Sequence, residues 1–461
     1  MSAALVLVTL SEGVLLGVVP STVAGIGQLL HVPPGSLNWI ISVQLLATGV
    51  CTPAFSRLGD IRGHRRILRV AVLLTAAGGV LVAVAPNFAL LLVGRALQGP
   101  AGAFTALAIG ILREQTATSR LRRGIAAVVT GASVGAAVGV LAAAELYRAT
   151  GSVRDVLWIP AACSAAAVAA AFAFVPETRW RARLRMDWLG AASLSTALAI
   201  LLLALASGAG WGWASGRTVG TLTASLVLLA FWVAVELRVP HPLIDLRAAA
   251  RRAVAPFYLA SLPIGVAFFG ATTATNTFMA ASRKASGYGF GLDVTAIAYV
   301  GLANASAVIL GAMAVPRLVK HTGHKPAIYA GCAVMFAGYT GLALWHGALW
   351  QVVVAGSVSS LGLGLIASAM AVTLTERADT ASTGISVGLY ITVRAIGGSM
   401  AGAGFAVLLR RSTIAGTEIP REWAYVTVWL ICGLAALLSL LIVVASGPGL
   451  SASADGECRR S

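Results

Sequence analysis

The sequence predicts an all-α integral membrane protein with fourteen transmembrane helices, arranged as two pseudo-symmetric six-helix bundles plus an inserted helix pair. Of its 461 residues, 58% are hydrophobic and 11% are charged, which is too apolar for a surface that faces water. Apolar runs of 18 or more residues recur, and about 20 residues in a helix cross a hydrocarbon core roughly 30 Å thick. A basic loop also occurs twice, about 260 residues apart.

The apolar runs define the fourteen predicted spans. They are rich in Ala, Leu, Val, Ile and Gly and lack the alternating pattern of a membrane β-barrel. Helices satisfy their own backbone hydrogen bonds in lipid. The first run lacks a cleavage site, so we expect a retained helix and not a signal peptide. In chain order the spans are about 4–27, 37–56, 67–86, 88–112, 123–146, 154–175, 188–208, 217–236, 256–281, 293–316, 326–346, 349–375, 382–409 and 423–446.

Lys and Arg in the loops orient the predicted helices. One set of alternate loops holds 22 of these residues and the opposite set holds 8. Because Lys and Arg favour cytoplasmic loops, we expect both termini to be cytoplasmic. The net charge of +17 is then explained by topology, and we expect no nucleic-acid partner.

The repeated loop divides the chain. Five residues recur at an offset of 260: Arg57, Leu58, Gly63, His64 and Arg65 match Arg317, Leu318, Gly323, His324 and Lys325. Glu114 and Gly135 match Glu376 and Gly397 at an offset of 262. We therefore predict an N-terminal bundle at 1–180, an inserted helix pair at 181–252, a C-terminal bundle at 253–446 and a disordered cytoplasmic tail at 447–461. Repeated bundles of this kind place a substrate site between them, near the bilayer midplane.

Several stretches resemble a known family. LNWIISVQLLATGVCTPAFSRLGDIRGHRR and LLLVGRALQGPAGA, together with the repeat, resemble the major facilitator superfamily of transporters. VPETRWRARLRMDWLGA, WGWAS and ELRVPHPLIDL resemble its fourteen-helix drug:proton antiporter branch, which includes multidrug and antibiotic efflux proteins. The resemblance covers essentially the whole chain and implies alternating access.

The first basic loop is a candidate conformational latch. Asp60, Gly63, Arg65 and Arg66 fit the loop pattern of the resembling family. The resemblance implies that Asp60 pairs with basic groups while the cytoplasmic side is closed. An exposed ion pair contributes only about 0–1 kcal/mol, so several pairs must act together. The alternative is a charged loop that only sets topology.

Glu12 and Arg95 are the candidate proton-coupling residues. An Arg at membrane depth costs roughly 2.5–3.5 kcal/mol on insertion scales, so Arg95 needs a cavity or a polar partner. It matches an Arg that the resembling family ties to proton movement, although a structural role near Pro100 stays open. A carboxyl in a medium of low dielectric constant binds a proton more readily. Glu12 lies in the first span, one position from Ser11, where the family usually has Asp, so it either substitutes for that Asp or faces elsewhere.

The remaining polar residues at depth are candidates for a substrate cavity. Uncharged groups suit hydrogen bonding to an amphipathic ligand in a mostly apolar site, but they equally join neighbouring helices, at about 0.6 kcal/mol each. Arg394 either binds an anionic or carbonyl group of the substrate or extends to the membrane surface. The cavity set is Gln44, Gln98, Asn276, Asn304 and Arg394.

Gly131, Gly135 and Gly139 predict close helix packing. Their spacing of four places them on one helix face and lets a neighbouring backbone approach. The antiporter signature of this helix normally has Pro after the second Gly, where this chain has Ala136. Half of that signature is therefore present.

These observations predict a secondary transporter for proton-coupled efflux of small amphipathic compounds, such as drugs, antibiotics or secondary metabolites. The second half holds no carboxylate at depth, so we expect neutral or weakly anionic substrates. An importer or uniporter of the same fold, or a transport-inactive scaffold or sensor, is the alternative. We expect no enzyme activity, because no catalytic cluster of His, Asp or Glu is found.

We also expect no cofactor and no metal, because the sequence has no phosphate-binding loop and its cysteines are scattered singly. The expected partners are substrate, protons and the lipid bilayer, with the chain a monomer. Its Ala-rich, Lys-poor composition favours the plasma (inner) membrane of a bacterium.

Overall fold

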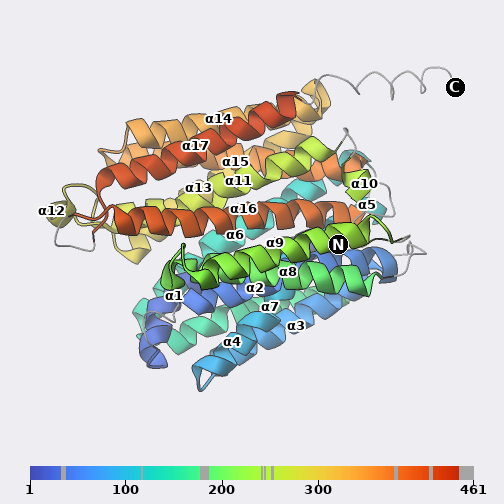
Figure 1. Cartoon of the computed structure of the whole chain (residues 1–461), viewed down its shortest axis with the longest axis horizontal. Coiled ribbons are helices and arrows are strands. Elements are labelled where there is room, and N and C mark those ends of the chain that lie inside the picture. The colour runs from blue at the N-terminus through green and yellow to red at the C-terminus, as the bar shows by residue number, and fades with distance from the viewer. Residues whose placement is uncertain are drawn as a thin grey trace.

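A computed structural model describes residues 1–32, 38–115, 118–176, 186–239, 242, 246–250, 254–377, 383–414 and 419–445. These ranges are helical almost throughout (Figure 1). The N-terminal helices are α1 (Ser2–Leu29), α2 (Asn38–Arg62), α3 (His64–Val84), α4 (Phe88–Leu97), η2 (Gly99–Ala103), α5 (Phe104–Gln115), α6 (Thr118–Thr150) and α7 (Val153–Ala173). The middle of the chain forms α8 (Trp188–Trp211), α9 (Gly216–Glu236) and the short α10 (Leu246–Ala249). The C-terminal helices are α11 (Ala255–Ala280), α12 (Arg283–Ser286), α13 (Val294–Thr322), α14 (His324–Leu344), α15 (Leu349–Arg377), α16 (Thr383–Arg411) and α17 (Glu422–Ala445).

The predicted class, an all-α membrane protein, is confirmed. In the described residues, thirteen helices are long and apolar enough to cross a membrane, with α4, η2 and α5 forming a single span. The predicted span at 188–208 falls on α8, whose apolar stretch Trp188–Leu201 is shorter than the others. The protein therefore crosses the membrane many times.

The two copies of the basic loop are one-residue hinges, which is shorter than predicted. Helix α2 runs to Arg62 and α3 begins at His64, so Gly63 alone separates them. Gly323 separates α13 from α14 in the same way. Their φ angles are 97° and 88°, in the region that only glycine adopts readily. The helices continue past the apolar runs into the basic residues, because a helical backbone satisfies its own hydrogen bonds whether its side chains are apolar or basic.

The predicted span at 88–112 is broken near its middle. Helix α4 ends at Leu97, and the chain passes through the 3₁₀ turn η2 before α5 begins at Phe104. Pro100 lies in this turn, and proline removes a backbone N–H that a continuous helix would use. The break places the last turn of α4, with Arg95, directly before the 3₁₀ turn.

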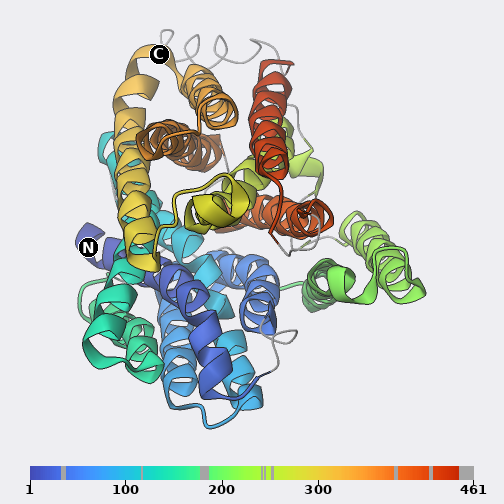
Figure 2. The same cartoon turned by 90° about the vertical axis from the view of Figure 1, so that its left-hand side faces the viewer.

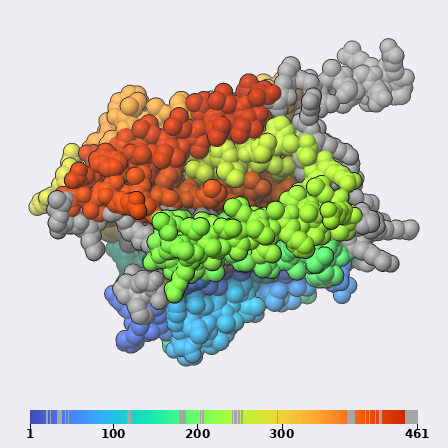
Figure 3. Space-filling model, viewed as in Figure 1, coloured from blue at the N-terminus to red at the C-terminus, as the bar shows by residue number. Residues whose placement is uncertain are grey.

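Two large groups of helices make up the protein. One apolar cluster is built mainly from α1 to α7, and another is built from α11 to α17. The two groups lie on opposite sides of the protein, and α8 with α9 stands at the side of the boundary between them (Figure 2). Helix α8 packs against α2 and α16, and α9 crosses the visible face between the N-terminal and C-terminal helices (Figure 3).

The two groups meet closely at the end that carries the hinges. Helix α2 packs against α16, and α6 packs against α13. Ala371, Val372 and Val387 belong to the C-terminal helices, yet they are buried in the N-terminal cluster. Gly388 lies so close to α2 that an added Cβ would stand 2.6 Å from Ser56 Oγ. This end of the boundary is therefore tightly packed.

Candidate functional site

Arg95 is the centre of a buried hydrogen-bond network. Only 1% of its surface is exposed, and Gln98 and Gln44 are 1% and 4% exposed. Arg95 Nε donates to Ile40 O at 2.8 Å, Nη1 donates to Gln98 Oε1 at 2.7 Å, and Nη2 donates to Gln44 Oε1. All these acceptors are uncharged, so hydrogen bonds compensate the cost of burying the guanidinium. The structure thus joins α4 to α2 through Arg95, and Gln44 and Gln98 are its direct partners.

Glu12 lies apart from this network. Its Oε2 accepts a hydrogen bond from the Thr105 hydroxyl of α5 at 3.3 Å. The adjacent Ser11 is buried and donates to Val8 O of its own helix at 2.7 Å. Arg394, on α16, is the charged group that acts electrostatically on Glu12. Glu12 thus bonds to Thr105 and feels the charge of a residue of the opposite helix group, and Arg95 bonds to other partners.

Arg394 lies between two aromatic rings. Its Cζ is 5.3 Å from the centre of the Tyr390 ring and 5.6 Å from that of Phe268. Its Nη1 donates to the Tyr390 hydroxyl at 3.4 Å, which is a weak bond for a charged donor. Its Nε is buried and has no hydrogen-bond partner in the described part of the chain. This guanidinium is weakly satisfied compared with that of Arg95.

The two predicted asparagines have different surroundings. Asn276 on α11 is exposed. Asn304 on α13 accepts a hydrogen bond from the Ser357 hydroxyl of α15 at 3.3 Å. That bond joins two helices, as the alternative interpretation of these residues expects. Thr275, next to Asn276, accepts from Trp429 Nε1 of α17 at 2.9 Å.

The predicted latch residues surround the first hinge. Asp60 is fully buried, and its Oδ1 lies 3.1 Å from His64 Nε2 across Gly63. Arg65 is partly buried and Arg66 is exposed. Arg57 of the same segment donates to Pro242 O at 2.9 Å, which connects this hinge to the chain that follows α9. The first hinge therefore contacts the inserted segment.

A cluster that the sequence did not predict joins the two helix groups. Arg122 of α6 forms a bidentate ion pair with Glu376 of α15, at 2.7 Å from Nε and 3.2 Å from Nη2. His324, at the second hinge, also contacts this carboxylate: its Nε2 lies 3.0 Å from Glu376 Oε2. Glu376 and His324 are both members of the sequence repeat, and this was the available signal. The repeat could not show that Arg122 faces them.

The glycines of α6 allow α1 to approach closely. A Cβ added at Gly131 would stand 2.5 Å from Thr9 Oγ1, and one at Gly139 would stand 3.0 Å from Val14 Cα. A Cβ at Gly135 would overlap the carbonyl oxygen of Leu10. These contacts place the three glycines on the face that α1 covers, and they hold the helix that carries Glu12.

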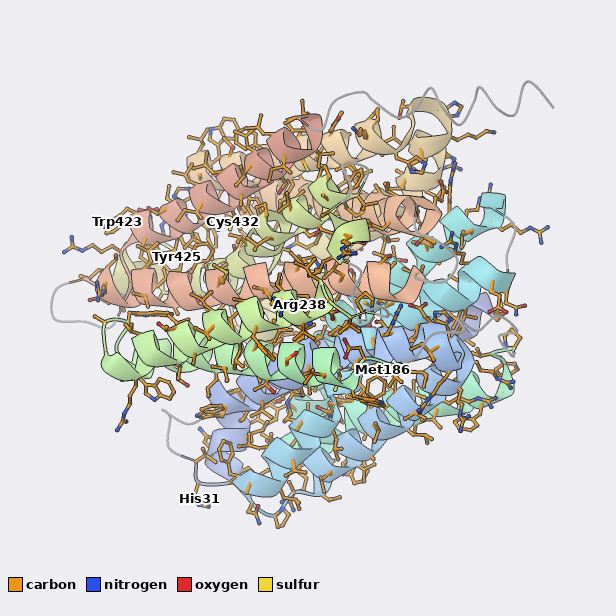
Figure 4. All side chains as sticks on the ribbon, turned by 45° about the vertical axis from the view of Figure 1, so that its right-hand side comes forward. His31, Met186, Arg238, Trp423, Tyr425 and Cys432 are labelled. Carbon is orange, nitrogen blue, oxygen red and sulfur yellow. The ribbon has the colours of Figure 1, made fainter. Side chains whose placement is uncertain are left out.

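Aromatic side chains fill the other end of the C-terminal helices. The Phe278 ring stacks on Tyr288 at 5.3 Å and meets Tyr425 and Trp429 edge-on at 5.5 and 5.2 Å. Tyr288 donates its hydroxyl hydrogen to Pro420 O at 2.6 Å. Tyr425 lies with Trp423 near one end of α17 (Figure 4). This cluster fastens α11 to α17 at the end opposite the hinges.

Comparisons with known proteins agree with this architecture. A structure of the human organic anion transporter MFSD10 (TETRAN) superposes with a TM-score of 0.67 at 14% identity, covering 96% of this chain and 97% of the other. A structure of a mutant of the nucleoside transporter NupG gives 0.58 at 14% identity, covering 96% and 99%. At such identities the likeness shows the fold alone.

Curated relatives match over short segments. An MFS-type transporter of Aspergillus terreus is 28% identical over 85 residues, and the efflux pump dotC of Dothistroma septosporum is 30% identical over 103 residues. The MFS-type transporter ppz2 of Metarhizium majus is 36% identical over 66 residues. These alignments cover 18%, 22% and 14% of this chain, and 15%, 18% and 11% of the relatives. The family model described as "Major Facilitator Superfamily" matches residues 1–402, and this protein therefore belongs to the Major Facilitator Superfamily of membrane transporters.

Proposed function

We propose that the protein is a secondary active transporter that exports small amphipathic compounds in exchange for protons. In this proposal α8 is the fourteenth membrane helix, as in the drug:proton antiporter branch. The pseudo-symmetric bundles 1–180 and 253–446 rock against each other, with the inserted pair 181–252 beside them. One fungal relative is named an efflux pump, which supports the direction.

The observation that carries the proposal is the position of Glu12. It is a carboxyl group in a membrane helix, its hydrogen-bond donor in the described structure is the Thr105 hydroxyl, and it lies where the opposite helix group exerts a charge. An ionisable group inside a membrane is costly and usually functional. A proton that binds Glu12 removes its charge, so protonation changes how the two groups attract each other.

We assign Arg95 a supporting role in proton coupling. Its guanidinium donates hydrogen bonds to Gln44 and Gln98. We therefore assign these two glutamines to the support of Arg95, and not to direct contact with substrate. Arg394 and the exposed Asn276 are the better candidates for substrate contact. Asn304 supports the cavity by joining α13 to α15.

The closed end of the boundary supports alternating access. The cluster Arg122–Glu376–His324 must break before the two helix groups separate there. Asp60, Gly63, Arg65 and Arg66 act beside it, because the hinge at Gly63 transmits movement of α2 to α3. In this proposal the protein is a monomer in a plasma membrane, with both termini cytoplasmic. The end that carries the cluster then faces the cytoplasm, and the protein is closed on that side. The curated relatives reported above are fungal, so a bacterial source rests on composition.

The proposal is tested in proteoliposomes with an imposed pH gradient, using wild-type protein and Glu12→Gln. Gradient-driven efflux of neutral amphipathic dyes is expected in the wild type, and loss of that dependence is expected in Glu12→Gln. Gln keeps the size and the hydrogen bond from Thr105 but carries no titratable group. Wild-type efflux that is independent of the pH gradient would exclude proton exchange. Efflux by Glu12→Gln that still depends fully on the gradient would exclude Glu12 as the proton-binding group.

A second candidate is an importer or uniporter of the same fold. The charge of Arg394 close to Glu12 favours it for substrates that carry a negative charge. The same proteoliposomes distinguish the candidates: a proton-coupled importer accumulates its substrate on the side that protons enter, a proton exchanger accumulates it on the side that protons leave, and a uniporter accumulates it on neither side.

A further inference from the structure

We infer that Arg394 binds the anionic group of an acidic amphipathic substrate, and that this anion and a proton on Glu12 bind cooperatively. The inference rests on the proposed function, because it uses Glu12 as the proton site. It adds the chemical class of one substrate and the sign of its coupling to protons.

The geometry of α16 directs Arg394 to the boundary. Val387 is buried in the N-terminal cluster, and Ile391 packs against the same cluster. Residues separated by four and seven positions share a helix face, so Arg394 continues this face one turn further along. Helix α5 packs against both α1 and α16, and its Thr105 holds Glu12. The carboxyl and guanidinium groups therefore face a common region from opposite helix groups.

Arg394 has the features of a receptor for an anion. Its Nε is buried and lacks a hydrogen-bond partner in the described structure, and its bond to Tyr390 is long, at 3.4 Å. A guanidinium offers a planar fork of donors that fits carboxylate, sulfonate or phosphate oxygens. Phe268 and Tyr390 supply apolar surface beside that fork. An amphipathic anion, with a ring next to its charged group, satisfies both features.

Charge balance makes the proton and the anion cooperate. With Glu12 ionised and no substrate bound, the carboxylate and the guanidinium sum to zero. With Glu12 protonated and an anion on Arg394, the site again sums to zero. A proton alone leaves a net positive charge, and an anion alone leaves a net negative charge. Uncompensated charge inside a membrane protein is costly, so the two ligands bind together.

Among the other titratable groups, the Tyr390 hydroxyl is in direct contact with Arg394, and most of the groups on neighbouring helices lie near helix ends. Helix α1 packs against α2, α5, α6 and α7, and α16 packs against α2, α5, α8, α11, α15 and α17. Among the charged groups of the described ranges, Arg394 acts electrostatically on Glu12. Apart from Cys51, Cys163 and Cys432, the titratable residues of the helices that pack on α1 and α16 lie within about two turns of helix ends: Arg57, Asp60, Arg62, Arg113, Glu114, Arg120, Arg122, Arg123, Glu145, Tyr147, Arg148, Arg154, Asp155, Asp187, Tyr258, Glu376, Arg377, Glu422 and Tyr425.

The coupling sign then depends on the charge of the substrate. A neutral compound does not engage the guanidinium as a counter-ion, and it is exchanged for the proton as proposed above. An anion binds Arg394 best when Glu12 is protonated, so it moves in the same direction as the proton. One site thereby supports exchange for neutral compounds and cotransport for acids.

The test measures proton uptake by purified protein in lightly buffered solution with a pH indicator. The probes are naphthalenesulfonate, which is ionised throughout the working pH range, and the neutral naphthalenesulfonamide. Adding the sulfonate to wild-type protein is expected to cause proton uptake, and its affinity is expected to be higher at acidic pH by about 5- to 150-fold, the usual range of coupling between sites. The sulfonamide is expected to cause no uptake.

Variants identify the two groups. Glu12→Gln is expected to bind the sulfonate with an affinity that does not change across the working pH range, and to take up no proton. Arg394→Gln is expected to lose sulfonate binding, and Arg394→Lys is expected to keep weaker, pH-dependent binding. Arg217→Gln, at an exposed position in the first turn of α9, is the matched control and should behave as wild type.

Several results would overturn the inference: no sulfonate binding to wild-type protein, binding that is independent of pH, proton release on binding, or undiminished binding in Arg394→Gln. If neutral compounds still exchange for protons through Glu12, the proposed function survives such a result. If Glu12→Gln changes neither efflux nor anion-linked proton uptake, the assignment of Glu12 as the proton site fails as well. Proton exchange itself is excluded if wild-type efflux of neutral compounds is independent of the pH gradient.

Discussion

Single residues in this protein carry charge into the membrane, and their partners differ in kind. Arg95 bonds to three uncharged acceptors on two segments. Arg394 has one weak bond and two aromatic neighbours. A guanidinium that is fully satisfied stabilises a fold, whereas one that is partly satisfied still has donors for a ligand. We therefore separate a structural arginine, Arg95, which is buried, from a recognition arginine, Arg394, which is half-buried.

Arg95→Lys should destabilise the protein even though it keeps the charge. A Lys ammonium cannot reproduce the planar fork that reaches Ile40 O, Gln44 and Gln98 together. Each buried acceptor left without a donor costs about 1–3 kcal/mol. Thermal unfolding of purified protein should show this loss, whereas Arg217→Lys should leave the unfolding temperature unchanged. An unaltered unfolding temperature in Arg95→Lys would contradict the structural role.

At the scale of elements, small residues determine which helices approach one another. The close contact of α1 with α6 depends on Gly131, Gly135 and Gly139. In the C-terminal group, α11 meets α16 through Gly397, where an added Cβ would overlap Leu262 O. Gly397 matches Gly135 in the sequence repeat. The two helix pairs hold Glu12 and Arg394, so backbone packing positions both groups.

Gly135→Ala should weaken the packing of α1 on α6, because the added methyl group meets the Leu10 backbone, which cannot rotate away. Overpacking of this kind typically costs about 1–3 kcal/mol. Gly220→Ala is the matched control: it lies in α9 with nothing within 4 Å of an added Cβ, and Ala favours a helix by about 0.5–1 kcal/mol over Gly. The unfolding temperature should fall for the first variant and stay level or rise for the second. Equal behaviour of the two would show that this contact is dispensable.

At the scale of the whole molecule, one cluster links the two helix groups at the closed end. Arg122, Glu376 and His324 come from three helices, and their side chains are 24%, 19% and 22% exposed. Screening by solvent limits the worth of such pairs. The buried contacts of Val387 and Gly388 with the N-terminal helices add to the closure. Opening therefore requires loss of both the charged and the apolar contacts.

Arg122→Glu should open this end more often, because it replaces an attraction to Glu376 by a repulsion. A cysteine introduced by Val387→Cys, in a background without the native cysteines, reports opening through its rate of labelling by a maleimide. Labelling should accelerate in R122E and slow again, in part, in R122E combined with E376R. The restoration is partial because Arg at position 376 faces His324. If E376R does not slow the labelling of R122E, the pair Arg122–Glu376 does not hold this end of the boundary closed.

Much of the architecture follows from the sequence because it depends on local patterns. Apolar runs predicted membrane helices, and the structure confirms thirteen of them in its described residues. Gly63 and Gly323 match each other in the sequence repeat, and both have the positive φ angles that favour glycine. The short length of the hinges was missed, because polar residues at a helix end do not alter the apolar pattern much. The structural alternative for Arg95 placed it near Pro100, and the structure has a 3₁₀ turn there.

The composition and the repeat by themselves determined that this chain is a helical membrane protein of a transporter family, with ionisable groups at membrane depth. The tertiary structure alone decided which of those groups meet. Arg95 takes the two glutamines as partners, Glu12 lies within the electrostatic reach of Arg394 from the other helix group, and Glu376 forms an ion pair with Arg122. Hydrophobic periodicity specifies which face of a helix is buried, but it carries no information on which distant helix covers that face, and contacts between the two groups arise only when both have folded.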